Sequence, residues 1–557
     1  MIDPQFKRSA KDVGGHAFFV LLRRLRQPLL VLIWVYAVSV LGFTLVPGVD
    51  PEGRTWRMSF LQAFYFVSFL GTTIGLGEIP YPFSEAQRLW ATASIYGTVV
   101  AWLYGIGALF SVLQDPLFRR ILHEKSAEMG VKRLKEPFII LCGYDDAGYR
   151  VCRELTESGS RIVVVDIDQT KVDRVDVDEH TVPVPALTGD ASDPRILEIA
   201  GLCDPFCSGI LALTGSDQVN TKIGLTARLL NPGVPVLCAA RDHGWHQHMA
   251  VAGVDHIINP FDTFAERIGI SLRTPSLHVI YEALTTQSGT AMTKVPQLPR
   301  NRWVLCGHDL FTRALRRQLD AEGIATTLVD KSPPPQSWEG EEHRDIAGAP
   351  TDPSVLKEAI QEDVGALVAG TKVDIDNLAI VLAASPHRKR LFVVARQEQR
   401  RNANVFKASG ADLVVLSGYV IAAEVLRQLR APLLSMFLRR AQDESEAWAT
   451  DLLDRLRTTV GENVLESWTV KVDAASTPQL FQALRAGHAL SVGRLLTNAD
   501  SNDERIRAVP LFLLRESPKG RQKILLPGDD VALSTGDKVL VCGSHASRVR
   551  MQAALLG

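Results

Sequence analysis

Long uncharged segments are confined to the first 115 residues of the chain. Residues 28–46 form a run of 19 without a charged side chain, and residues 89–113 form a second run of 25. At a rise of 1.5 Å per residue the first run reaches about 28 Å, close to the ~30 Å hydrocarbon core of a bilayer. We therefore predict an outer membrane-spanning helix over 28–46 and an inner one over 86–114. Two buried core helices or a cleaved signal peptide are the alternatives, and the length of the uncharged runs opposes both.

Basic residues flank both predicted spans. They are Lys7, Arg8, Lys11, Arg23, Arg24 and Arg26 before the first, and Arg119, Arg120 and Lys125 after the second. The positive-inside rule then places both termini in the cytoplasm of a cell (inner) membrane protein. Residues 1–27 become a cytoplasmic N-terminus, 28–114 the membrane domain and 115–136 a charged linker, while everything after the linker is cytosolic.

A third apolar stretch, Met58–Leu70, lies between the spans and is too short to cross a bilayer. A re-entrant helix is the physical option, and Thr72-Thr73-Ile74-Gly75-Leu76-Gly77-Glu78 follows it directly. Non-helical backbone at membrane depth is tolerated where it lines a water-filled cavity. Glycines at alternate positions let successive carbonyls point toward one axis, as in a potassium filter. We therefore predict a pore helix and filter over 58–78.

The segment Thr73–Gly77 resembles the potassium-channel signature TVGYG followed by an acid, with Ile74 for Val, Leu76 for Tyr and Glu78 for Asp. The resemblance implies a selectivity filter made of Thr72, Thr73, Ile74, Gly75, Leu76 and Gly77, with K⁺ bound at Thr73, Ile74, Gly75 and Leu76. One chain supplies one pore loop, so a homotetramer is needed to close the ring. Leucine lacks the tyrosine hydroxyl, which leaves a non-selective cation pore as an alternative.

Three glycines interrupt the predicted inner helix, Gly97, Gly105 and Gly107. A glycine inside a helix costs roughly 1 kcal/mol relative to alanine and makes a bend easier. We expect one of them to be a gating hinge. Close helix packing through small residues is the competing interpretation.

A strand–turn–helix–strand pattern occurs twice in the cytosolic part. Phe138–Cys142 precedes the turn of Gly143, a helix follows, and Arg161–Asp166 forms the next apolar run. The same order recurs at Trp303–Cys306 and Thr326–Asp330, 164 positions later. This βαβ layout predicts two doubly wound parallel sheets of the dinucleotide-binding kind, over 137–295 and 300–460. Short strands and turns after Ser467 predict a small α+β lobe over 465–557.

The duplicated Rossmann-like module behind a two-span pore resembles two-span potassium channels that carry tandem RCK (regulator of K⁺ conductance) domains. The resemblance covers essentially the whole chain. It implies a helical two-span pore domain with a re-entrant pore helix, two α/β RCK domains and a C-terminal lobe. It also implies a gating ring of eight RCK domains beneath a tetrameric pore.

The glycine fingerprints depart from the consensus. Asp145 and Asp309 stand where the middle glycine lets a pyrophosphate approach, and Thr312 replaces the third glycine of the second copy. Asp166 suits a ribose hydroxyl, which favours NAD or an ADP/ATP-type nucleotide over NADP. The candidate nucleotide-binding residues are Gly143, Tyr144, Asp145, Asp146, Gly148, Asp166, Asp190, Gly307, Asp309 and Asp330. Purely structural sheets are the alternative.

Calcium is the competing ligand, but its ligating residues are not assigned. Acidic runs stand at Asp173, Asp176, Asp178 and Glu179, and at Asp374 and Asp376. His243, His246 and His248 cluster without a partner carboxylate at metal-ligand spacing. The three histidines are therefore not predicted to form a metal site.

Composition narrows the class of function. The chain has 557 residues and a net charge of −1, which argues against a nucleic-acid partner. Seven cysteines without a C-x-x-C pair are expected to be small buried hydrophobes. We predict a ligand-gated potassium channel in a lipid bilayer, and not an enzyme. A membrane-anchored NAD-dependent oxidoreductase is the rival from another class, and a non-conducting ion sensor is a third reading.

Overall fold

The computed structural model describes residues 4–75, 77–115, 125, 127–285, 298–333, 343–461, 465–497, 505–517 and 520–556. The chain divides into two compact units, Met1–Arg133 and Leu134–Gly557. Each unit is described by itself.

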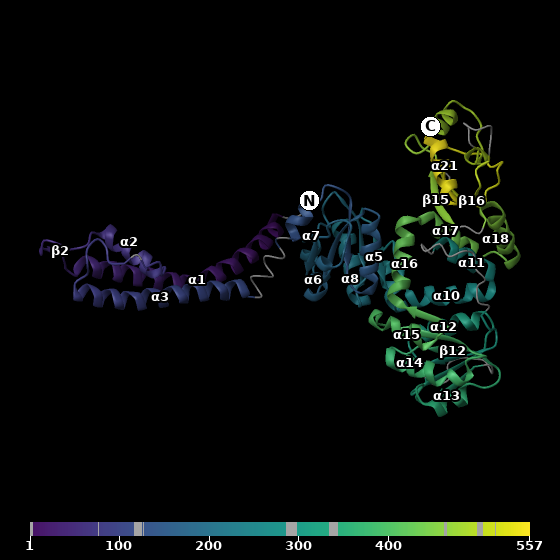
Figure 1. The fold of residues 1–557 in the computed structure, drawn as a ribbon. Coiled ribbons are helices and arrows are strands. Elements are labelled where there is room, and N and C mark those ends of the chain that lie inside the picture. Colours follow the sequence, from purple (N-terminus) through teal and green to yellow (C-terminus); the bar gives the residue numbers. More distant parts are fainter. Residues whose placement is uncertain are drawn as a thin grey trace. The chain divides into compact units, whose positions relative to one another are not determined.

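The first unit is a helical hairpin with a short helix between its arms. Its elements are α1 (Pro4–Leu45), a two-strand ribbon of β1 (Gly48–Val49) and β2 (Thr55–Trp56), α2 (Phe60–Gly71) and α3 (Glu85–Gln114). Helices α1 and α3 pack along each other (Figure 1). The Trp90 indole N–H donates to the Ser39 carbonyl at 3.1 Å, and only glycine at 42 leaves room for that ring. Two segments, Leu25–Leu45 and Glu85–Leu113, are long and apolar enough to cross a membrane.

Helix α1 begins far earlier than the predicted outer helix. It starts at Pro4 rather than at residue 28, and Pro28 lies inside it. The hydrophobic pattern marks the part of a helix that can lie in a bilayer, whereas the preceding lysines and arginines are themselves good helix formers. Helix α3 begins one residue before the predicted inner helix.

The first sheet of the second unit has six parallel strands in the order β5-β4-β3-β6-β7-β8. The strands are β3 (Phe138–Cys142), β4 (Arg161–Asp166), β5 (Ala186–Thr188), β6 (Cys207–Ala212), β7 (Val236–Ala239) and β8 (His256–Ile258). The helices between them are α5 (Asp146–Glu157), α6 (Gln169–Val177), α7 (Pro194–Ile199), α8 (Asp217–Leu230) and α9 (His243–Val251). The predicted Rossmann-like fold is confirmed.

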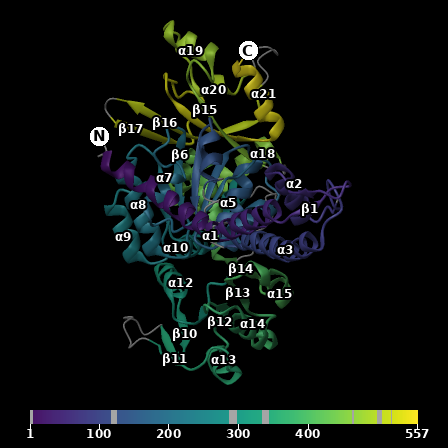
Figure 2. The same ribbon diagram turned by 90° about the vertical axis from the view of Figure 1, so that its left-hand side faces the viewer.

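The second sheet repeats this topology in the order β11-β10-β9-β12-β13-β14 (Figure 2). Its strands are β9 (Arg302–Cys306), β10 (Thr326–Asp330), β11 (Arg344–Ala347), β12 (Val364–Ala369), β13 (Phe392–Gln397) and β14 (Leu413–Leu416). Its helices are α12 (Leu310–Ala321), α13 (Pro353–Ala359), α14 (Asp374–Ala383) and α15 (Ala403–Ser409), with 3₁₀ turns η1 (Ser385–His387) and η2 (Arg400–Asn402).

The helix that follows each sheet packs against the other copy. Helix α10 (Pro260–Arg273) lies on α12 of the second copy, and α16 (Ser417–Arg430) lies on α5 of the first. Accordingly Ile421 and Val425 belong to the core of the first copy, while Phe264 and Ile268 belong to that of the second. The two copies therefore exchange helices.

Helices α11 (Pro275–Thr285), α17 (Pro432–Ala441) and α18 (Glu446–Val460) complete this region. Helix α16 ends at Arg430 and α17 begins at Pro432, with Ala431 between them. Pro432 cannot donate a backbone hydrogen bond, so it ends α16 and begins α17.

The C-terminal part contains a four-stranded antiparallel sheet in the order β15-β18-β16-β17, drawn in yellow-green and yellow in Figure 2. Its elements are β15 (Glu466–Lys471), α19 (Pro478–Arg485), α20 (Val492–Leu495), β16 (Ala508–Ser517), β17 (Gly520–Leu525), β18 (Lys538–Gly543) and α21 (His545–Leu556). Trp468, Leu513 and Val541 share its core.

One cysteine departs from the sequence expectation. Cys203 is exposed, whereas the other six thiols are buried, and all seven are free. Burial raises the pKa of Cys152 and of Cys238 to about 12, so these thiols stay protonated at neutral pH.

Candidate functional site

The short apolar helix α2 has both ends fixed. Ser59 and Gln62 form a capping box at its start, and the Thr72 hydroxyl donates to the Ser68 carbonyl at 2.9 Å at its end. Gly71 lies so close to Tyr36 that a Cβ would stand 2.5 Å from the tyrosine oxygen. That oxygen accepts a 2.9 Å bond from the Trp102 indole, which joins α1 to α3 beside the end of α2.

The segment after α2 alternates its backbone conformation. The φ angles are +63° at Thr73, +65° at Gly75 and +89° at Gly77. A positive φ is a strained state for a β-branched residue such as threonine, and such strain concentrates at functional sites. Leu76 lies outside the described residues.

A carboxylate ties the end of this segment to the start of α3. Arg88 Nε donates to Glu78 Oε1 at 2.9 Å, and the Phe83 backbone N–H donates to Glu78 Oε2 at 2.8 Å. Glu78, which follows Gly77, is thereby held at both carboxylate oxygens.

The three hinge candidates lie within the continuous helix α3. A Cβ on Gly97 would stand 3.4 Å from Val35 Cγ1, whereas a Cβ on Gly105 or Gly107 would meet nothing within 4 Å. The hinge stays a prediction.

The first glycine turn requires its glycines. Gly143 has a φ of +99°, and a Cβ there would stand 2.9 Å from the Leu213 backbone. A Cβ on Gly148 would lie 2.0 Å from the Gly143 carbonyl, so only glycine lets α5 approach β3 this closely. The Tyr144 N–H donates to Asp166 Oδ2 at 2.7 Å, which anchors the turn on β4.

A cavity of about 890 Å³ opens beside this turn. Its wall includes Tyr144, Asp145 and Asp146 of the first copy and Arg400 and Arg401 of the second. A volume of this size falls in the ~300–1,000 Å³ range of small-molecule pockets.

Two charged residues of the first copy meet at this wall. Lys171 Nζ lies 2.5 Å from Asp145 Oδ1. Burial is the largest single effect and opposes the lysine charge, but the hydrogen bond to Asp145 and the charges of Asp145, Asp166 and Asp168 together outweigh it, so the pKa of Lys171 is raised. The lysine charge is therefore engaged by a carboxylate of the same copy.

Not every predicted nucleotide-binding residue reaches the cavity. Tyr144, Asp145 and Asp146 line it, whereas Gly143, Gly148 and Asp166 do not. Asp166 is buried and accepts bonds from Tyr144 and Asp168. Asp190 accepts the Ser192 N–H at 2.8 Å and is also no part of the wall. These four residues shape the turn or its surroundings instead.

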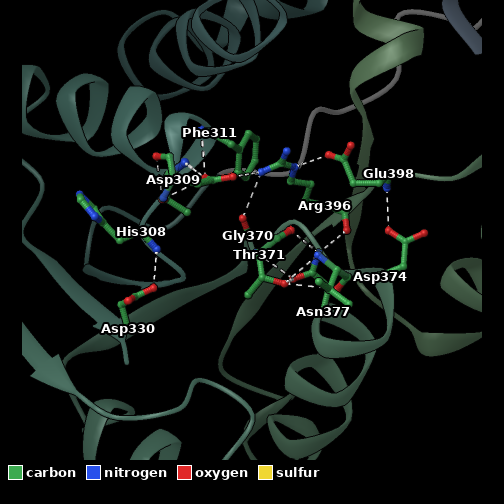
Figure 3. A network of polar contacts seen from close by, with 12 residues as sticks. His308, Asp309, Phe311, Asp330, Gly370, Thr371, Asp374, Asn377, Arg396 and Glu398 are labelled. Carbon is green, nitrogen blue, oxygen red and sulfur yellow. Dashed lines mark hydrogen bonds and ion pairs between the residues drawn. The ribbon is translucent and has the colours of Figure 1, made fainter. Parts of the chain in front are cut away.

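The second glycine turn has the same anchor. Gly307 has a φ of +93°, and the His308 N–H donates to Asp330 Oδ2 at 2.8 Å (Figure 3). Asp309 caps α12 by accepting the backbone N–H groups of Phe311 and Thr312 at 3.0 and 3.1 Å.

An arginine fills the space in front of this second turn. Arg396 forms an ion pair with Asp309, and the exposed fractions of their side chains are only 5% and 10% (Figure 3). The guanidinium also lies 4.9 Å from the ring centre of Phe261 and 5.4 Å from that of Phe311. The space left nearby, lined by Arg241, Leu310 and Arg313 among others, has about 310 Å³. The predicted site at Gly307, Asp309 and Asp330 is thus occupied by the protein's own side chain.

Sequence reasoning missed a repeated asparagine clamp. Asn220 accepts the Thr214 N–H at 3.0 Å and donates to the Ala239 carbonyl at 2.9 Å. Asn377 makes the matching bonds to Thr371 and Arg396 in the second copy. The shared threonine-to-asparagine spacing of six residues was the available signal.

Two of the acidic residues considered for calcium, Asp178 and Asp374, are engaged in other bonds. Asp374 accepts the backbone N–H groups of Glu398 and Gln399 at 2.7 and 3.1 Å, and Asp178 accepts the Tyr144 hydroxyl at 2.9 Å. Within the described part of the chain, no group of three His, Cys, Asp or Glu side chains is placed to hold a metal ion.

Comparisons with known proteins agree with the duplicated fold. The TrkA-N domain model matches residues 139–260 and 303–417. Potassium channel protein 1 of Methanocaldococcus jannaschii is 23% identical over 288 residues, which are 50% of this chain and 82% of that protein. The voltage-gated potassium channel Kch of Escherichia coli is 26% identical over 219 residues, 38% of this chain and 49% of Kch. The chain spans 34% to 62% of the other curated relatives it matches.

Among solved structures, the GsuK channel bound to NAD is 15% identical, with a TM-score of 0.43, and the match covers 97% of this chain and 100% of that one. The named relatives are potassium channel and potassium uptake proteins rather than enzymes. The TrkA-N domain model thus matches the chain twice in tandem, and the chain is similar in sequence to proteins named as potassium channels.

Proposed function

We propose that the chain forms a homotetrameric potassium channel whose pore is opened and closed by its cytosolic RCK domains in response to an adenine nucleotide. The pore is built from residues 28–114, and both termini lie in the cytoplasm of a cell membrane. K⁺ binds at the carbonyl oxygens of Thr73, Ile74, Gly75 and Leu76.

One observation carries the pore proposal, the alternating positive φ angles at Thr73, Gly75 and Gly77 directly after an apolar helix. Alternation of this kind turns successive peptide carbonyls toward one side of the segment. Four such segments around an axis can replace the hydration shell of an ion. The strained Thr73 supports this use, because an ordinary turn has no need of threonine at φ +63°.

Reconstitution of the full chain in liposomes tests the proposal. We expect K⁺ flux that exceeds Na⁺ flux and that changes when NAD, ADP, ATP or Ca²⁺ is added on the cytosolic side. Equal K⁺ and Na⁺ flux would favour the non-selective pore, and flux of neither ion under any of these ligands would refute the channel.

The open cavity beside Gly143 supports the nucleotide part of the proposal. A nucleotide that binds one conformation of the cytosolic domains better shifts the closed–open equilibrium by its differential affinity. The linker over 115–136 connects these domains to α3 along the chain. The second copy is excluded from this proposal because Arg396 occupies its site.

Replacing Asp145 by asparagine is expected to tighten ADP and NAD binding by about tenfold. The change removes a carboxylate from the cavity wall and releases Lys171 for a phosphate. Calorimetric titration of the purified chain measures the affinity. Asp190→Asn is the matched control, since Asp190 lies outside the wall. Unchanged affinity for D145N would place the phosphates elsewhere.

The hinge proposal is tested at Gly105 and Gly107, where alanine meets no neighbour within 4 Å. Each alanine stabilises the helical conformation of α3 by about 1 kcal/mol relative to glycine, and it does so without a steric clash in the described unit. We expect the open probability in single-channel recordings to fall severalfold in the double variant. An unchanged open probability in G105A/G107A and in G97A would refute the hinge.

A further inference from the structure

Three cations of the first copy line its own cavity, Lys171, Arg174 and Arg241, and two of them are already engaged. Lys171 is paired with Asp145, and Arg241 donates to the Gly215 carbonyl at 2.7 Å. Three further carboxylates, Asp146, Asp178 and Glu398, also line the wall. A pyrophosphate bound here needs cations in addition to Arg174, since the helix N-terminus behind it carries Asp145 and Asp146.

The second copy brings two arginines to this wall. The turn η2 follows β13 and places Arg400 and Arg401 at the cavity. The Arg400 N–H donates to Asp146 Oδ2 at 3.1 Å, and its guanidinium lies 4.5 Å from the ring centre of Tyr149. These contacts fix the arginine against α5 of the first copy while leaving its charge unneutralised.

Neither arginine is used in an ion pair. Among the residues that the structure describes, no carboxylate forms a salt bridge with the side chain of Arg400 or Arg401. Arg401 Nε donates only to the neutral Gln399 side chain, at 2.7 Å. Two uncompensated guanidinium groups at one cavity wall are suited to bidentate binding of phosphate oxygens.

The repeat shows that this arrangement is particular to the first cavity. Arg241 of the first copy corresponds to Arg396 of the second, so Arg400 and Arg401 correspond to Trp245 and His246. The smaller space beside α12 therefore faces no arginine pair from the first copy, and Arg396 already neutralises its aspartate. The second copy thus brings two adjacent arginines to the first cavity, whereas the first copy brings a single arginine, Arg241, to the smaller space.

We propose that Arg400 and Arg401 of the second copy bind the phosphates of a pyrophosphate-bearing adenine nucleotide held in the cavity of the first copy. The inference rests on the proposed function and adds to it the residues and the mode of action. A ligand bound in this way bridges the two copies, and its binding pulls η2 toward α5. Because η2 follows β13 directly, the same movement reaches Arg396 and its pair with Asp309.

Titration of the full chain in detergent with ADP, NAD and adenosine tests this inference. We expect R400A/R401A to bind ADP and NAD at least tenfold more weakly than the wild type and to bind adenosine equally well. K389A/R390A is the matched control, because it removes two exposed cations of the same copy, and it is expected to bind all three ligands normally. R401A alone gives a second variant with an expected loss of about threefold, since the Arg401 side chain donates a hydrogen bond to the neutral Gln399.

Three other outcomes would overturn different parts of the proposal. ADP affinity of R400A/R401A within twofold of the wild type would overturn the inference and leave the proposed function standing. An equal loss for adenosine would overturn the phosphate assignment. Failure of the wild type to bind ADP or NAD would overturn both. Hydrogen exchange gives an independent readout, since ADP is expected to protect the backbone amides of 398–402.

Discussion

Potassium flux through the reconstituted chain is expected to fall by at least about 100-fold when Gly77 is replaced by alanine, and by a similar factor for Gly75→Ala. Both glycines have positive φ, +89° and +65°, which an L-residue adopts only at a cost. Alanine would relax toward negative φ and rotate the neighbouring carbonyls away from the axis. A Cβ at either position meets nothing within 4 Å in the described unit, so the effect arises in the backbone.

The control for this result is Gly53→Ala. Gly53 has a φ of +79° in the turn between β1 and β2, and a Cβ there also meets nothing within 4 Å. The variant therefore carries a comparable backbone penalty away from Thr72–Gly77, and its flux is expected to stay near the wild-type level. Normal conduction by G77A, or an equal loss in G53A, would contradict the assignment of the filter.

Arg396→Ala is expected to destabilise the second TrkA-N copy by about 3–5 kcal/mol, because it leaves Asp309 buried without its partner. The pair is nearly inaccessible, and the arginine also contacts two aromatic rings. A change of this size lowers the unfolding midpoint of a domain of this length by roughly 10 °C. Thermal unfolding of the purified chain, followed by near-ultraviolet circular dichroism, measures it.

Two further variants test whether the loss of stability comes from breaking the buried Arg396–Asp309 pair or from removing any charged residue. Lys171→Ala breaks the counterpart ion pair of the first copy, where the exposed fractions are 29% and 48%, and is expected to cost less than about 1 kcal/mol. The double variant D309N/R396M removes both charges and is expected to recover most of the lost stability. Equal unfolding midpoints for R396A and K171A would show that the Arg396–Asp309 pair does not stabilise the second copy more than the exposed pair stabilises the first.

Much of the fold follows from local pattern. The uncharged runs locate the bilayer-length parts of α1 and α3, since few soluble helices go so long without charge. The alternation of buried strands and helices gives both parallel sheets, and the 164-residue repeat gives the duplication. The start of α1 could not be read in this way, because a basic helix and a basic loop look alike in hydropathy.

The sequence indicated only one side of the cavity wall. The turn residues Tyr144, Asp145 and Asp146 follow from the glycine pattern, but Arg400 lies more than 250 positions further along the chain. Its place at the cavity depends on α16 packing against α5, which no local signal encodes. The same holds for Arg396, whose repeat relation to Arg241 was evident while its pairing with Asp309 was not. Long-range packing decides which of two similar turns stays open.

The exchange of α10 and α16 sets a rule for building chimeras of this chain. Each sheet is covered by a helix that the gene encodes with the other sheet, so Ile421 and Val425 complete one core and Phe264 and Ile268 complete the other. If the first copy of a relative replaced residues 137–295, the native α16 would pack against a surface that it does not complement. Exchanging this region for that of a relative therefore requires both TrkA-N copies to be transplanted together.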